Sequence, residues 1–217
     1  MSEKPSSPAI DSPKAAQPTE NPWLEWLKTL GVSLVLAIGI RHFIVESRFI
    51  PSESMVPTLQ VNDRLLVEKL SYYARDPKRG DIIVFLPPEG MKEMSPGFHQ
   101  ALIKRVIATP GDTFEMHGGV VYINGTAIAE DYTADEPCLD YCDLSAVTLP
   151  EDAYIALGDN RNRSSDSRVW GYVDRDDVIG RAWIRIWPPS RFGAIDAQPV
   201  YPVDGPNALN SVAPSTK

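Results

Sequence analysis

The chain has 217 residues, 43% of them hydrophobic, and its 29 acidic and 21 basic side chains give a formal net charge of -8. This length predicts one sizeable domain, and the negative charge argues against a protein that binds nucleic acid through phosphate contacts, so we expect no nucleic-acid partner. Twenty prolines and fourteen glycines lie among short runs rich in Val and Ile, which favours a mainly β fold over a helical bundle.

The two ends of the chain have the composition of disordered segments. Residues 1–22 are rich in Pro, Ser, Lys and Glu and show no apolar periodicity. Such a segment cannot bury enough apolar surface to offset the entropy lost on ordering. We predict disordered tails over residues 1–22 and 202–217.

Residues 23–45 form the candidate membrane helix. The uncharged run from Thr29 to Ile40 is shorter than the roughly 20 residues that a spanning helix needs, so a buried helix and a signal-peptide core are alternatives. Lys28 and Arg41 can reach toward opposite interfaces, two tryptophans suit an interfacial belt, and no proline interrupts the segment. No small-residue cleavage pattern follows, which disfavours a removed signal peptide. We predict one transmembrane anchor, which its flanking charges do not orient.

Residues 46–201 alternate between short extended runs and turns. Asn124-Gly125 is a hairpin turn signal, and residues 87–99 are predicted to form a loop. Together they predict a β-rich domain over residues 46–201. The predicted strands cover Arg64 to Lys69, Asp81 to Leu86, Leu102 to Ala108, Val120 to Ile123, Ala153 to Leu157 and Arg181 to Trp187.

Cys138 and Cys142 are the two cysteines of the chain. They are too few for a structural zinc site, which takes four ligands, so no metal is expected. Two free thiols and one small disulfide loop both fit the spacing, and the choice depends on the redox compartment.

Two segments could supply a nucleophile and a base. Ser52 and Ser54 stand between prolines, where a hydroxyl can be held rigidly, although Ser/Pro clusters are more often solvated loops. In the strand from Leu102, alternation gives Lys104 apolar neighbours on its own face. Desolvation lowers the pKa of a lysine and so favours its action as a general base. The alternative is a structural role, in which a lysine on an edge strand prevents aggregation.

A third segment, residues 158–168, is dense in charges and hydroxyls. Its Asp159 and Asp166 could pair with arginines, including Arg105 beside Lys104, and a hydroxyl could orient the lysine amine. A solvated charged loop is the alternative. A Ser-His-Asp triad is disfavoured, because none of the three histidines lies in these segments.

Taken in order, these segments resemble the bacterial type I signal peptidase (leader peptidase) family, in its compact single-anchor form. The resemblance covers roughly residues 23 to 190. Its motifs are Ser-x-Ser-Met-x-Pro-Thr-Leu at 52–59, Arg-Gly-Asp-Ile-Ile-Val-Phe at 79–85, Lys-Arg-Val-Ile-Ala-x-Pro-Gly-Asp at 104–112 and Gly-Asp-Asn-Arg-x-x-Ser-x-Asp-Ser-Arg at 158–168.

The resemblance implies a serine endopeptidase with a Ser-Lys dyad and no cofactor. Ser54 would be the nucleophile and Lys104 the general base. The oxyanion hole would combine the Ser52 hydroxyl with the Ser54 backbone N–H. The implied supporting residues are Ser164, which orients the lysine, and the ion-pairing Asp166, Arg105 and Arg168.

The implied substrates are secretory preproteins, cut after small residues of the Ala-x-Ala type. The substrate would lie extended beside Ile50, Leu102 and Ile103, in the manner of an added β-strand. The implied location is a single pass through the cell membrane, or through another internal membrane if the cell has one. The lipid bilayer would then be a partner, with the tail of residues 1–22 in the cytoplasm and the antiparallel β catalytic domain on the extracytoplasmic side. We expect the protein to be a monomer.

The chain departs from the family motifs at two positions. Glu53 stands where the family often has Gly, and Arg163 where Asp and Asn are common; neither removes a catalytic group. Other readings are a self-cleaving repressor, which would carry a DNA-binding domain, and a catalytically silent tethered module, which would lack Ser54 or Lys104.

Overall fold

The computed structural model describes residues 21–134 and 137–195. The two predicted tails lie outside these residues, except for Asn21 and for Pro22, which already belongs to a helix. The chain divides into two compact units, Met1–Gly39 and Ile40–Lys217.

Helix α1 (Pro22–Phe43) corresponds to the predicted anchor. Its stretch Pro22–Arg41 has a mean hydropathy of 1.5 and no buried residues, and among the described residues it is the one helix long and apolar enough to cross a membrane. The helix ends two residues before the predicted boundary at 45, because the chain enters strand β1 at Val45.

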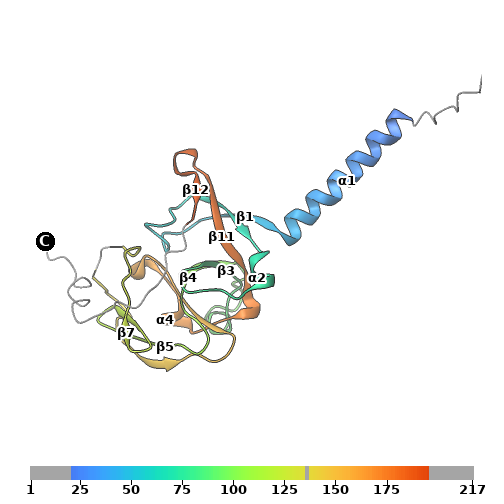
Figure 1. Ribbon diagram of the computed structural model, residues 1–217. Helices are drawn as coiled ribbons and strands as arrows, with labels where there is room; N and C mark the ends of the chain where they lie inside the picture. The colour runs from blue at the N-terminus through green and yellow to red at the C-terminus, as the bar shows by residue number, and fades with distance from the viewer. Residues whose placement is uncertain (1–20, 135–136, 196–217) are drawn as a thin grey trace, which may run out of the picture. The chain divides into compact units, whose positions relative to one another are not determined.

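From Val45 onward the described chain folds into two antiparallel sheets, which confirms the predicted fold class (Figure 1). The larger sheet has the order β1-β2-β11-β3-β4-β9-β10, with β12 paired to β11, and the smaller has the order β7-β6-β5-β8. The strands of the larger sheet are β1 (Val45–Phe49), β2 (Arg64–Glu68), β3 (Ile82–Phe85), β4 (Leu102–Ala108), β9 (Ala153–Leu157), β10 (Val173–Asp174), β11 (Val178–Trp187) and β12 (Gly193–Ala194). Those of the smaller sheet are β5 (Thr113–His117), β6 (Val120–Ile123), β7 (Thr126–Ala127) and β8 (Leu144–Thr148).

Short helices occupy several connections. Residues 87–99 were predicted to form a loop, and this prediction is wrong for Glu89–Met94, which form helix α3. The helix begins directly after two prolines. The hairpin turn is confirmed: Asn124 and Gly125 both have positive φ between the antiparallel strands β6 and β7. The remaining short helices are α2 (Ser71–Ala74), η1 (Arg161–Arg163), α4 (Ser167–Trp170), η2 (Arg175–Asp177) and η3 (Pro189–Arg191).

The apolar core has three clusters, and β4 contributes to each of them. Ile107 packs with side chains of the smaller sheet, Val106 packs with Phe85 and Trp170, and Ile103 borders a cluster under the serine segment. Strand β4 is therefore fixed from several sides, which gives Lys104 a rigid support.

Candidate active site

Ser54 lies in the connection between β1 and β2, where apolar side chains anchor the backbone. Met55 and Leu59 are 0% exposed and pack in one cluster with Ile50 and Leu65. Burying a side chain of this size stabilises the fold by roughly 1.5–3 kcal/mol, so each anchor holds the segment firmly. Ser54 itself is buried, whereas its neighbours Ser52 and Glu53 are exposed.

Lys104 reaches Ser54 from strand β4. Its Nζ donates a hydrogen bond of 2.8 Å to Ser54 Oγ and another of 3.0 Å to the carbonyl oxygen of Ile103. The Ser52 hydroxyl lies 3.4 Å from Ser54 Oγ. Two side chains that are 50 positions apart in sequence thus meet as a hydroxyl and an amine in hydrogen-bond contact, which is the geometry of a nucleophile beside its base.

Burial is the main cause of the unusual acidity of Lys104. The side chain is 4% exposed, and desolvation lowers its pKa to about 8, while Asp166 and Asp159 act to raise it and Arg168 acts to lower it. A substantial fraction of the amine is therefore neutral at mildly alkaline pH, where it can accept a proton.

The segment from residue 158 to 168 is tied to β4 by a buried ion pair. Arg105 binds both carboxylate oxygens of Asp159, at 2.8 and 2.7 Å, and also donates to the carbonyl oxygen of Gly80. Asp166 binds Arg168 and accepts a hydrogen bond from the Gly158 backbone N–H. These contacts confirm the pairing of Asp159 and Asp166 with arginines that the sequence predicted.

Ser164 lies close to the nucleophile segment but has an unexpected environment. Its Oγ is buried and has no hydrogen-bond partner among the described residues. Lys104 Nζ donates its hydrogen bonds to Ser54 Oγ and to the Ile103 carbonyl oxygen, and the orienting role of Ser164 stays a prediction.

Two further residues of this network were missed in the sequence. Glu130 accepts two hydrogen bonds from the Arg161 guanidinium, at 2.9 and 2.6 Å, and Tyr132 places its ring 4.1 Å from the Arg105 guanidinium carbon. Both lie in the connection between β7 and β8, which has no apolar periodicity, and their partners are about 30 residues away. No local signal could have indicated them.

The predicted substrate residues have different surroundings. Strand β4 pairs with β3 over Leu102 to Arg105 but with β9 only from Arg105 onward, so within the described part of the chain the backbone at Leu102 and Ile103 has no strand partner on one side. Leu102 and Ile103 are half-buried, whereas Ile50 is 2% exposed and belongs to the core cluster under Met55. An extended peptide could therefore pair beside residues 102 and 103.

Gly158 is packed so closely against the site that a side chain cannot be accommodated. A Cβ at this position would lie 2.3 Å from Ser164 Oγ and 2.5 Å from the carbonyl oxygen of Ser54. We expect Gly158→Ala to separate the two segments and to lower kcat by about 10²-fold, the order of effect of a 1 Å misplacement. Gly193→Ala, which meets no atom within 4 Å, is the matched control for cleavage kinetics. Wild-type kcat in Gly158→Ala would contradict this packing argument.

Within residues 21–134 and 137–195, no group of three His, Cys, Asp or Glu side chains could hold a metal ion.

Comparison with known proteins identifies relatives over almost the whole chain. Residues 23–187 match the family described as "Signal peptidase, peptidase S26". A "Signal peptidase I" of Leptolyngbya laminosa is 50% identical over 197 residues, covering 91% of this chain and 94% of that protein. A "Probable signal peptidase I-2" of Synechocystis is 50% identical over 184 residues, covering 85% and 82%. A "Probable thylakoidal processing peptidase 2, chloroplastic" of Arabidopsis thaliana is 38% identical, covering 77% of this chain and 45% of that protein.

Proposed function

Because the chain belongs to the signal peptidase family, peptidase S26, and removes signal peptides from exported preproteins, we propose that Ser54 and Lys104 are its catalytic dyad. The observation that carries this assignment is the 2.8 Å hydrogen bond from Lys104 Nζ, on a 4% exposed side chain, to Ser54 Oγ. A buried amine with a lowered pKa in contact with a hydroxyl is the combination that a Ser-Lys mechanism needs.

The reaction follows from this geometry. Neutral Lys104 removes the Ser54 hydroxyl proton while Ser54 Oγ attacks the scissile carbonyl carbon. The Ser54 backbone N–H and the Ser52 hydroxyl stabilise the oxyanion. The lysine ammonium then protonates the leaving amine, the mature protein departs, and a water molecule activated by the same lysine hydrolyses the acyl-enzyme ester.

The supporting residues would act through the lysine. Arg105 fixes Asp159, and Arg168 fixes Asp166, so both carboxylates stay at set positions relative to Lys104. Ser164 would orient the amine once substrate excludes water from the site. These residues position the base and do not contact the scissile bond.

The substrate would pair along the open side of β4 at Leu102 and Ile103, with Ile50 buried in the core cluster that includes Met55 and borders Ile103. Helix α1 fits a membrane anchor. With it, residues 1–22 would form a cytoplasmic tail and residues 46–201 an extracytoplasmic catalytic domain, acting as a monomer at the bilayer surface and binding no nucleic acid. Whether the membrane is the cell membrane or an internal one can be tested by fractionation of the source cells.

The function is tested with the full-length protein in phospholipid-detergent micelles and a preprotein carrying an Ala-x-Ala site. We expect one cut, directly after the second Ala, identified from the N-terminal sequence of the mature product. Cleavage elsewhere, or equal cleavage by Ser54→Ala, would contradict the proposal.

Specificity for small residues gives a separate prediction. Replacing the Ala before the cut by Leu should lower kcat/KM at least about tenfold, because extra methylene groups must enter a shallow pocket. The same replacement two residues before the cut, where the side chain points to the opposite side of an extended peptide, serves as the control. Equal kcat/KM for Ala and Leu before the cut would argue against such a pocket.

A further inference from the structure

The two positions at which this chain departs from the family motifs are the two ends of one ion pair. Arg163 Nη1 lies 3.2 Å from Glu53 Oε2. Glu53 stands between Ser52 and Ser54, and Arg163 directly precedes Ser164. The pair therefore joins the segment that carries the nucleophile to the segment that contains the predicted lysine-orienting serine.

Below this ion pair the same two segments are already in close contact. The Asn160 backbone N–H donates a 3.1 Å hydrogen bond to the Ser54 carbonyl oxygen, and Gly158 leaves no space for a Cβ between Ser54 and Ser164. This contact is buried, whereas the side chains of Glu53 and Arg163 are 55% and 67% exposed. Ser54 is thus linked to this segment by a backbone contact on the inside and by an ion pair at the surface.

The backbone that carries Arg163 is held by a disulfide-closed loop. Cys138 and Cys142 form a disulfide, which answers the question that their spacing left open. The side chain of Asn162 accepts a hydrogen bond from the Leu139 backbone N–H and donates one to the Pro137 carbonyl oxygen.

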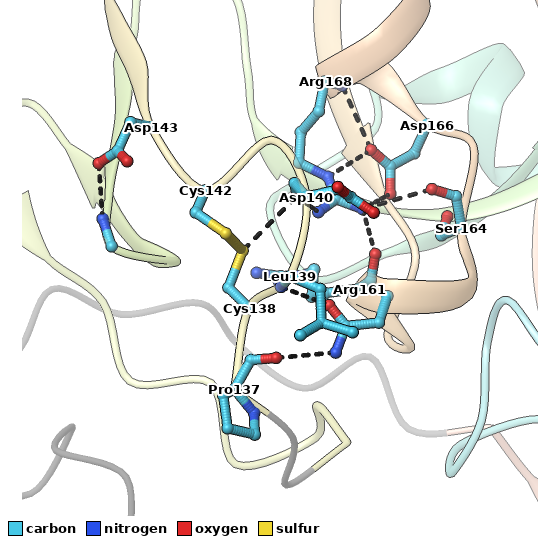
Figure 2. The surroundings of a disulfide bond; sticks show 12 residues. Pro137, Cys138, Leu139, Asp140, Cys142, Asp143, Arg161, Ser164, Asp166 and Arg168 are labelled. Atoms are coloured by element: carbon cyan, nitrogen blue, oxygen red, sulfur yellow. Dashed lines mark hydrogen bonds and ion pairs between the residues drawn. A yellow bond between two sulfur atoms is a disulfide. The ribbon is translucent and has the colours of Figure 1, made fainter.

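Figure 2 shows this loop beside the segment from Arg161 to Arg168, where Arg168 also approaches the Asp140 carbonyl oxygen at 3.5 Å. These contacts hold the backbone of helix η1 (Arg161–Arg163) in place. Less backbone conformational entropy is therefore lost when Arg163 forms its ion pair.

We propose that Glu53 and Arg163 form a clasp that positions Ser54 against the segment of residues 158–168, which the Arg105–Asp159 ion pair in turn ties to the strand of Lys104. They are positioning residues, since they act through the serine segment. The proposal rests on the proposed dyad and adds to it an ion pair that positions the nucleophile. An exposed pair is weak, so the clasp adjusts the rate and does not determine whether the fold forms.

The test measures kcat and KM of the full-length protein with the Ala-x-Ala preprotein for Glu53→Gln, Arg163→Gln and the charge swap Glu53→Arg with Arg163→Glu. We expect each single variant to lose kcat by up to about fivefold with KM unchanged, and the swap to recover most of the loss. The control is Glu89→Gln, which breaks the exposed Glu89–Lys92 pair within helix α3 and should leave kcat unchanged.

Salt gives a second readout that a purely structural role would not produce. Raising ionic strength from about 0.05 to about 0.5 M screens exposed charges, so wild-type kcat should fall toward that of Glu53→Gln, while Glu53→Gln changes little. Wild-type kcat in both single variants, no recovery in the swap, or an effect confined to KM would each overturn the clasp. The proposed function fails separately, if Ser54→Ala still cleaves.

Discussion

Ser54→Ala and Lys104→Met should each reduce preprotein cleavage by at least about 10³-fold, because members of a nucleophile-base pair act as a unit. Without Ser54 there is no Oγ to form the acyl-enzyme, and without the Lys104 amine the hydroxyl keeps its proton at neutral pH. The measurement is kcat/KM on the Ala-x-Ala preprotein with purified full-length variants.

Lys104→Arg is the sharper control, since it keeps the positive charge and most of the stem. A guanidinium remains protonated throughout the accessible pH range and cannot act as a base, so this variant should be inactive at every pH tested. Circular dichroism and thermal unfolding establish that each variant is folded. A folded Lys104→Arg protein that retains a tenth of wild-type activity would exclude Lys104 as the base.

The sequence predicted the parts of the fold that have strong local patterns. The anchor helix, the Val/Ile-rich strands and the Asn124-Gly125 turn all rest on composition or on neighbouring residues. Strands β5 and β8 were missed although β5 alternates in burial, because its polar positions and the short runs around it resemble a loop. Helix α3 was missed because prolines, Gly and Met dominate the segment around it.

The candidate site depends on contacts between segments far apart in sequence, and only some of these could be inferred. Local chemistry made Ser54 and Lys104 weak candidates separately, and the ordered motifs were needed to bring them together. The Glu53–Arg163 ion pair shows the limit of this reasoning. In the sequence both residues were only departures from a motif, and their proximity follows from how β4 and the segment after β9 fold around Ser54.

Cleavage should rise with pH, with half of the maximal kcat/KM near pH 8. The base must be neutral to act, and burial lowers the pKa of Lys104 to about 8. The neutral fraction falls about tenfold for each pH unit below the pKa, so kcat/KM at pH 6 should be about 10² lower than on the alkaline plateau. A profile that falls from pH 6 to pH 9 would contradict a neutral lysine base.

The charges around Lys104 allow this profile to be shifted in either direction. Asp166 stabilises the ammonium, so Asp166→Asn should lower the pKa of Lys104 and shift the profile to lower pH. Arg168 destabilises the ammonium, so Arg168→Gln should shift it to higher pH. Opposite shifts cannot arise from a general loss of structure, which would lower activity at all pH values. Shifts of the same sign in both variants would argue against Lys104 as the titrating group.

The same pKa links catalysis to stability. The pKa of Lys104 is lowered on folding from 10.5 to about 8, so the folded protein binds fewer protons than the unfolded chain between these values. The free energy of unfolding therefore increases as pH rises from 8 to 10.5. Below pH 8 the buried amine is protonated, which destabilises the fold by about 3 kcal/mol at most. Lys104→Met should then be inactive yet more stable than wild type at pH 7, with the difference shrinking toward pH 10.5. Urea unfolding of both proteins across this range measures it, and a difference independent of pH would show that the amine is not desolvated.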